Sequence, residues 1–389
     1  MAIIYRLNDT CFTKKSSLQC QDSNDCIDLA GKYGFPAEEH QLETDDFYRL
    51  RIHRIPGSPS SPKASGKPIV FIQHGMLGIS SMFVLGGPNK DLAFILADAG
   101  YDVWLGNTRG NTYSRSHATL SPDRDSQFWE FSFHEMALYD LPTTIDYILG
   151  ITNQTSLVYI GHSMGSTMSI VLLSMKPEYN KKIHLVINMA GIYTWKEPRP
   201  TIKFLRDNGQ HIKRVIVFFG INELFPHRII RRYFSNSTYC EERFFQSACL
   251  NIALLINGYN SDLDLNLFSK SFPHFPAGIS RKTAIHFHQN MLAGKLQMFD
   301  YGYIDNMAYY GSMFPPAYNI ENVLTRVVMI YGKKDTLASP EDSIDLSSKL
   351  KNSWVETVPF ENFSHIDYIW GKNMKRLIHD RILQIIVNN

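Results

Sequence analysis

A serine flanked by two glycines constrains this chain more than any other feature of its sequence. Residues 157–167 read LVYIGHSMGST, so that a short apolar run leads through Gly161 and Ser163 to Gly165 and a stretch with helical spacing. Such glycines allow the sharp strand-to-helix turn that leaves a serine hydroxyl exposed at the edge of a sheet. A five-residue pattern also occurs by chance in ordinary turns, but its position between strand and helix favours a nucleophile.

A serine hydroxyl is a weak nucleophile until a base takes its proton, so this interpretation requires a histidine and an acid. After this kind of turn they follow in the order serine, acid, histidine. Asp335 follows the apolar run at 327–332, and His365 follows the run at 354–359. We predict that Asp335 orients His365, which passes the proton of Ser163 to the leaving group. Three other acids nearby are expected to be solvated residues of helices or loops: Asp342, Asp345 and Asp367.

Hydrogen-bond donors must stabilise the charge that develops on the attacked carbonyl oxygen. We expect one donor to be the backbone amide of Met164, directly after the nucleophile. The other is predicted in the loop at 73–78, with the sequence QHGMLG, where Met76 is the preferred residue. The glycines of this loop allow a close approach of the backbone, although a glycine-rich turn without function is the alternative.

Apolar runs bounded by turn residues alternate with segments of helical spacing over much of the chain. Strands are predicted at 68–72, 101–105, 157–160, 183–189 and 327–331, and helices at 140–149, 164–175, 341–350 and 374–387. This alternation is typical of the α/β class, with a mainly parallel sheet covered on both faces. It stops between about 195 and 310, where Phe, Tyr, Asn, His and Pro are frequent. We interpret this segment as an insertion that is either extra core or a cap over the substrate.

Composition excludes several classes of function. Lys and Arg number 39 against 37 Asp and Glu, for a net charge of +2, and no dense basic block indicates nucleic acid as a partner. The longest apolar runs, such as 215–219 and 252–256, are far shorter than the ~18 residues of a transmembrane helix. Residues 1–25 lack the apolar core of a secretory signal. His286 and His288 have a spacing that suits a metal, but further ligands of clear spacing are missing, so no metal site is predicted.

Cysteines and glycosylation triplets give conflicting indications of the compartment. The cysteines are Cys11, Cys20, Cys26, Cys240 and Cys249, and an odd number leaves at least one thiol unpaired or bonded outside the chain. Acceptor triplets for N-glycosylation occur at Asn8, Asn153, Asn236 and Asn362. They would fit an exported protein, but such triplets also arise by chance.

From about Tyr33 to the C-terminus, the chain resembles the acid lipases of the animal gastric and lysosomal type. The motifs that carry the resemblance lie at 34–40, 73–78, 104–111, 128–136 and 276–280. The resemblance implies an α/β-hydrolase fold with a mainly parallel sheet. Its core would comprise 31–194 and 311–389, with a largely helical cap and mobile lid at 195–310, after an atypical N-terminal extension at 1–30.

The resemblance also implies an activity, the hydrolysis of neutral-lipid esters by Ser163, Asp335 and His365, without a metal or an organic cofactor. Triacylglycerols and cholesteryl esters are the implied substrates. A disulfide between Cys240 and Cys249 is implied as well. The family often has Gln at the position of Met164, but the backbone amide survives this exchange, so the oxyanion role is expected to persist.

The resemblance places the protein in the secreted or lysosomal space, while the unusual N-terminus leaves an intracellular form open. We expect a monomer that acts on neutral lipid at a lipid–water interface, with no nucleic acid partner. Two alternatives stay open. One is an esterase for smaller acyl esters, and the other is a non-catalytic, lipid-binding relic of the fold. The intact set of Ser163, Asp335 and His365 argues against the relic, which would be free to lose it.

Overall fold

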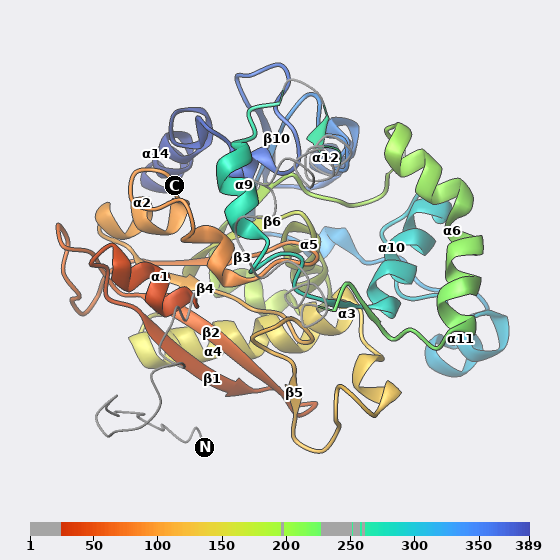
Figure 1. Ribbon diagram of the computed structural model, residues 1–389. Coiled ribbons are helices and arrows are strands. Elements are labelled where there is room, and N and C mark those ends of the chain that lie inside the picture. The colour runs from red at the N-terminus through yellow and green to blue at the C-terminus, as the bar shows by residue number, and fades with distance from the viewer. Residues whose placement is uncertain (1–24, 196–197, 227–250, 252–256, 259–260) are drawn as a thin grey trace.

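A nine-stranded sheet forms the centre of the molecule in a computed structural model (Figure 1), in which residues 25–195, 198–226, 251, 257–258 and 261–389 are described. The strand order is β1-β2-β4-β3-β6-β7-β10-β11, with β5 paired to β2. Neighbours from β4 to β11 run parallel, whereas β2 is antiparallel to β1, β4 and β5. The strands are β1 (Glu38–Glu43), β2 (Tyr48–Ile55), β3 (Ile69–Gln73), β4 (Asp102–Leu105), β5 (Ser116–His117), β6 (Leu157–His162), β7 (Ile183–Met189), β10 (Arg326–Tyr331) and β11 (Ser353–Thr357).

Helices cover both faces of this sheet, with α2 and α14 on one side and α4 on the other (Figure 1). The helices are α1 (Cys26–Lys32), α2 (Leu92–Asp98), α3 (Phe133–Glu135), α4 (Leu141–Thr152), α5 (Met164–Met175), α6 (Pro200–Phe218), α9 (Leu265–Ser271), α10 (Arg281–Ala293), α11 (Tyr303–Tyr310), α12 (Pro340–Lys349), α13 (Asp367–Trp370) and α14 (Asp380–Val387). Within the described ranges, no helix is both long and apolar enough to cross a membrane.

The mainly parallel α/β architecture agrees with the sequence prediction. Strand β7 and helix α5 have the predicted limits, and the other four predicted strands begin and end within two residues of the observed ones. The hairpin of β1 and β2 was not predicted, because strands with one solvated face do not form continuous apolar runs. In β1, with the sequence EEHQLE, only Leu42 is apolar and buried.

Parallel strands bring segments that are distant in sequence to one edge of the sheet. Strand β6 ends directly before Ser163, β10 ends at Tyr331, four residues before Asp335, and β11 ends at Thr357, before the loop that carries His365. In open α/β sheets, ligands bind at this carboxyl edge. The fold therefore collects the predicted catalytic residues at the edge where chemistry is expected.

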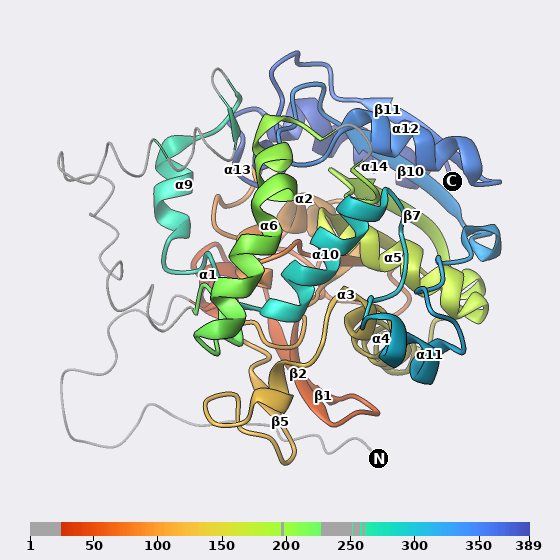
Figure 2. The ribbon, with the colours of Figure 1, turned by 90° about the vertical axis from the view of Figure 1, so that its right-hand side faces the viewer.

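The segment between about 195 and 310 contributes no strand to the central sheet within its described residues. Helices α6 and α10 pack side by side in this segment (Figure 2). Two short strands, β8 (Glu223–Leu224) and β9 (Ile279–Ser280), form a separate antiparallel pair. The segment thus places two long helices beside the carboxyl edge of the sheet.

Candidate active site

Ser163 occupies a strained turn between β6 and α5. Its φ of 54° and ψ of −116° are unfavourable for a residue with a side chain, and such strain is typical of functional positions. Steric crowding at the two flanking positions requires glycine. A β-carbon on Gly161 would lie 2.7 Å from the carbonyl carbon of Gly165, and one on Gly165 would lie 2.5 Å from the carbonyl oxygen of Gln73. Both glycines therefore allow the tight turn at which the hydroxyl faces the cavity.

The structure brings Ser163, His365 and Asp335 into one hydrogen-bonded chain. Nε2 of His365 lies 2.9 Å from Oγ of Ser163, and Nδ1 lies 3.1 Å from each carboxylate oxygen of Asp335. A carboxylate only accepts, so Nδ1 carries the proton that is donated to Asp335, and Nε2 accepts from the serine hydroxyl. This arrangement is competent to transfer the serine proton to the imidazole.

Backbone groups fix the acid of this chain. Oδ1 of Asp335 accepts hydrogen bonds from the amides of Leu337 and Ala338, at 2.8 and 2.7 Å. Gly332 lets this loop touch the histidine loop, because a β-carbon at residue 332 would lie 2.4 Å from the carbonyl oxygen of Phe363. The two amide hydrogen bonds and the close approach of the two loops therefore set the position of the carboxylate relative to the imidazole.

The expectation that Asp342 and Asp367 are solvated is wrong, because both are almost completely buried. The carboxylate of Asp342 accepts from the amides of Thr194 and Trp195 and so holds the segment after β7. Asp367 accepts from the amides of Asp262 and Ser364, and burial raises its pKa to about 7. Asp345 is partly exposed and pairs with Lys349. Buried Asp342 and Asp367 thus have structural partners, whereas Asp335 faces the imidazole.

The two predicted oxyanion donors lie on adjoining segments. Met164 directly follows the nucleophile, and Met76 lines the same cavity as Ser163. The absent side chain of Gly75 lets its loop approach the nucleophile, since a β-carbon there would lie 2.8 Å from the β-carbon of Ser163. In the described part of the chain, neither the Met76 amide nor the Met164 amide donates to another residue. Both amide hydrogens are therefore without a partner among the described residues.

His74 holds the peptide that carries the Met76 amide, and it was not predicted as a site residue. Nε2 of His74 accepts from the amide of Thr108, so Nδ1 carries the proton and donates to the carbonyl oxygen of Gly75 at 2.7 Å. Burial lowers the pKa of His74 to about 4, which keeps the ring neutral near pH 7. A trans peptide directs its N–H opposite to its C=O, so holding the Gly75 carbonyl fixes where the next amide points. The signal in the sequence that could have identified His74 was its place directly after a buried strand, at the carboxyl edge of the sheet.

His162, the residue before Ser163, holds the loop that carries His365. Its Nε2 donates to the backbone carbonyl of His365 at 3.2 Å. Burial, together with the nearby His365, lowers the pKa of His162 to about 3. A neutral ring at this position anchors the His365 loop without adding a second positive charge when His365 accepts a proton.

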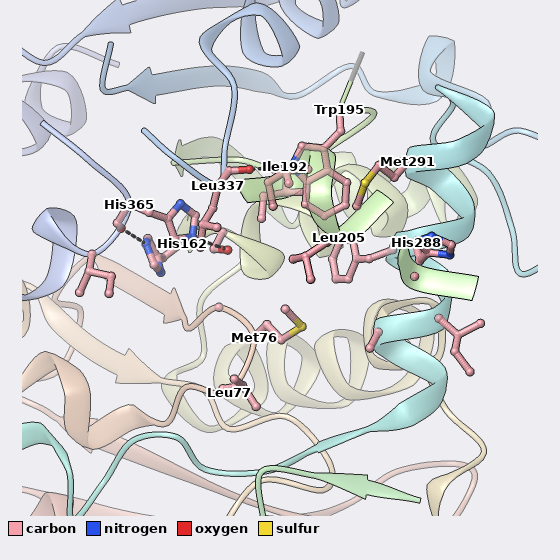
Figure 3. Close-up of a pocket in the computed structure, with 18 of the residues that line it drawn as sticks. Met76, Leu77, His162, Ile192, Trp195, Leu205, His288, Met291, Leu337 and His365 are labelled. Carbon is pink, nitrogen blue, oxygen red and sulfur yellow. Dashed lines mark hydrogen bonds between the residues drawn. The ribbon is translucent and has the colours of Figure 1, made fainter. Parts of the chain in front are cut away.

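A mainly apolar cavity of about 360 Å³ opens at the nucleophile (Figure 3). Pockets for small ligands commonly start at roughly this volume. One wall comes from facing stripes of α6 and α10, and the other side comes from the loops at the sheet edge. Apolar lining residues include Leu77, Trp195, Leu205, Ile212, Ile285, Phe287, Met291 and Ile369. The site can therefore hold an apolar group next to Ser163.

The two histidines of α10 have different surroundings. His286 is fully buried, with Nδ1 2.9 Å from Oγ of Ser132 and Nε2 2.8 Å from the carbonyl oxygen of Gln297. Burial lowers its pKa to about 3, and its ring stacks on Phe133. His288 instead lines the cavity. The two side chains thus lie on different faces of α10, and only His288 reaches the cavity.

Several predicted features lie outside the described residues, namely Cys11, Cys20, Cys240, Cys249, Asn8 and Asn236. Cys26 is buried, and it forms no disulfide within the part of the chain that the structure describes. Asn153 is exposed at the end of α4, and Asn362 is partly exposed three residues before His365. Glycosylation at Asn153 and Asn362 stays a prediction.

Two family models match the chain. One describes the α/β hydrolase fold and covers residues 68–372, and the other describes a partial α/β-hydrolase lipase region and covers residues 26–87. Lipase 3 of Drosophila melanogaster is 38% identical over 93% of this chain and 92% of its own length. The human gastric triacylglycerol lipase is 37% identical over 91% of this chain and 88% of its own.

Among solved structures, a putative lipase from Sulfolobus solfataricus has a TM-score of 0.55 at 14% identity, covering 90% of this chain and 93% of that one. At this identity the likeness concerns the fold. The curated relatives, in contrast, share more than a third of their residues with this chain over nearly its whole length. The chain therefore belongs to the acid lipase family of the α/β-hydrolase fold and is a carboxylic ester hydrolase.

Proposed function

We propose that this protein hydrolyses carboxylic esters of neutral lipids, triacylglycerols or cholesteryl esters, through an acyl-enzyme on Ser163. The observation that carries the proposal is the hydrogen-bonded chain from Asp335 through His365 to Ser163, which opens into a mainly apolar cavity. The human relative named gastric triacylglycerol lipase supports a glyceride substrate.

Acylation begins when His365 takes the proton of Ser163 while Oγ attacks the ester carbonyl. The negative charge passes to the carbonyl oxygen, where the amides of Met76 and Met164 donate hydrogen bonds. Asp335 stabilises the imidazolium that forms. Collapse of the tetrahedral intermediate breaks the bond to the alcohol oxygen, which receives the proton from Nε2 of His365.

Deacylation repeats these steps with water. His365 removes a proton from water as the water oxygen attacks the acyl carbonyl, and the same two amides hold the oxyanion. The bond to Oγ breaks, Ser163 regains its proton from His365, and the fatty acid leaves. Over the whole cycle, one ester and one water give one acid and one alcohol, and Ser163 and His365 return to their starting protonation states.

The apolar wall supports a lipid rather than a polar ester as substrate. A long acyl chain gains affinity from burial of its surface, at about 25 cal/mol per Å². We propose that residues 195–310 form a cap, with α6 and α10 as its described wall, and that part of it opens as a lid at a lipid surface. Amide hydrogen exchange, measured with and without lipid micelles, tests the lid. Exchange rates at 195–310 that are the same in both conditions would count against it.

We also propose that the protein is exported as a monomer, in the secreted or lysosomal space, with a Cys240–Cys249 disulfide that an oxidising compartment would preserve. The exposure of Asn153 and the partial exposure of Asn362 are compatible with glycans. Mass spectrometry of the native protein, before and after reduction and deglycosylation, tests both modifications. Two free thiols at 240 and 249 would overturn the disulfide.

The substrate proposal is tested by fatty acid release from triolein, cholesteryl oleate and a short-chain ester, with the wild type and Ser163→Ala. We expect the wild type to cleave at least one long-chain ester, and the variant to lose activity on all three. Preference for the short-chain ester alone would identify an esterase for smaller acyl groups. Absence of turnover in the folded wild type would leave a lipid-binding protein, and equal turnover in Ser163→Ala would remove Ser163 from the mechanism.

A further inference from the structure

A second cavity adjoins the apolar cavity, and the side chains that line both of them form a partition between the two. The second cavity, of about 480 Å³, lies between α6, α10 and the segment at 297–302. Three side chains line both cavities: Lys213, Ile285 and His288. The lining of the second cavity is more polar and includes Gln210, Gln289 and Asp300. A chain that fills the first cavity would therefore meet polar surroundings beyond these three residues.

Of the three side chains in the partition, that of His288 is held in place by contacts with α6. Its Nε2 donates to the backbone carbonyl of Arg206 on α6, at 3.0 Å. Its ring also lies against Gly209, where a β-carbon would come within 2.2 Å of Nε2. The imidazole thus fills the gap between α6 and α10 at a position where α6 has no side chain. Lys213, in contrast, has a flexible stem that can move aside.

The chemistry of the reaction gives the direction of the acyl chain. The leaving alcohol must receive its proton from His365, so it lies on the side of that imidazole. The acyl chain leaves the carbonyl carbon in another direction, and the wall of α6 and α10 offers it apolar surface. Figure 3 shows His365 and His288 at opposite ends of the lining, with Leu205 and Met76 between them.

We propose that His288 closes the far end of the acyl-binding cavity and thereby sets the preferred acyl length. This inference rests on the proposed function, since it assigns the α6–α10 side of the cavity to the acyl group. A tail that ends before His288 stays in apolar surroundings. A longer tail has to displace the ring, break its bond to Arg206 or fold back.

Each methylene that enters apolar surroundings is expected to raise kcat/KM by about fourfold. In the wild type this rise should continue with chain length until the tail reaches His288, and should then stop. In His288→Ala the space of the removed imidazole joins the two cavities. The apolar side chains of Ile285 and Leu292 line the second cavity beside its polar residues, so the first added methylenes still gain apolar contact. The rise should then continue for at least two more methylenes, a gain of roughly 15-fold in the ratio of long-chain to short-chain kcat/KM.

The experiment compares p-nitrophenyl esters from butyrate to stearate, held in one detergent, for the wild type and three variants. His288→Ala removes the partition, and His288→Phe keeps a ring of similar size without the hydrogen bond. Gln210→Ala truncates an exposed residue of α6 that lines only the second cavity. We expect a longer preferred chain in His288→Ala alone. If His288→Ala does not fold, His288→Val replaces it, because its shorter side chain cannot reach Gly209 and still opens part of the gap; a smaller shift in the same direction is then expected.

An unchanged length profile in folded His288→Ala overturns the inference, as does an equal shift in Gln210→Ala. Butyrate hydrolysis provides the separate control for the proposed function. If the wild type cleaves butyrate and Ser163→Ala does not, the serine mechanism stands whatever the length profile shows. If Ser163→Ala cleaves all esters at the wild-type rate, the proposed function fails before the role of His288 is in question.

Discussion

The two sides of the cavity are built in opposite ways. On the sheet side, Asp335 and Ser163 are only 1% and 4% exposed, and backbone amides or neighbouring rings fix the polar groups. On the α6 side, Leu205 and Ile212 each line the cavity although 40% of their surface is exposed. The difference indicates a division of labour. Proton transfer requires atoms held within tenths of an ångström, whereas binding of an acyl chain requires mainly apolar area.

This comparison predicts two kinds of variant. Changes at the sheet edge should lower kcat for every ester by the same factor, because all substrates share the reacting atoms. Changes in the α6–α10 wall should act in proportion to acyl length, because only long chains reach it. Three substitutions test this division, from the largest expected effect to the smallest.

Asp335→Asn should lower kcat by about 10⁴-fold for short and long esters alike. The amides of Leu337 and Ala338 require an oxygen at the Oδ1 position, so the new NH₂ group would face His365. The imidazole would then accept at Nδ1 and carry its proton on Nε2, where it cannot take the serine proton. Steady-state kinetics on both esters measures the effect, and thermal unfolding checks that the variant folds. A loss below tenfold would contradict the assigned role of Asp335.

His74→Ala should lower kcat by about 10²-fold with little change in KM, the loss typical of a misplaced oxyanion donor. The Gly75 carbonyl would lose its imidazole partner, and the Met76 amide would lose its fixed direction. His74→Gln retains a side-chain donor and should recover part of the rate. If both variants instead raise KM and leave kcat unchanged, His74 affects binding and the positioning role is wrong.

Ile212→Ala should lower kcat/KM for a long-chain ester by about tenfold and leave a short-chain ester nearly unchanged, because only the long chain loses contact area. Val215→Ala provides the matched control. Val215 lies on the same helix, is 55% exposed and does not line the cavity. Equal losses on short and long esters in Ile212→Ala would break the proposed division between the two sides.

The sequence predicted those parts of the molecule that local pattern determines. An apolar run predicted the limits of β7, and helical spacing predicted those of α5. The glycines around Ser163, with the order of Asp335 and His365, led to residues that the structure brings together. The hairpin of β1 and β2 was not predicted, because one face of it is solvated and its sequence therefore contains no continuous apolar run.

Other features depend on contacts that no local pattern reveals. The carboxylates of Asp342 and Asp367 each accept from an amide more than 100 residues away in the sequence, so their burial has no local signal. His74 acquires its role through Thr108, which follows the neighbouring strand. The partition at His288 exists only because Gly209 comes opposite it when α6 packs on α10.

Covalent trapping tests the central claim most directly. An alkyl phosphonate p-nitrophenyl ester resembles the tetrahedral intermediate and should form a stable bond to Oγ of the nucleophile. We predict one phosphonate per molecule, located on Ser163 by peptide mass spectrometry, with loss of ester hydrolysis in parallel and no labelling of Ser163→Ala. Stoichiometric labelling at another residue, or full activity in a protein labelled at Ser163, would contradict the account.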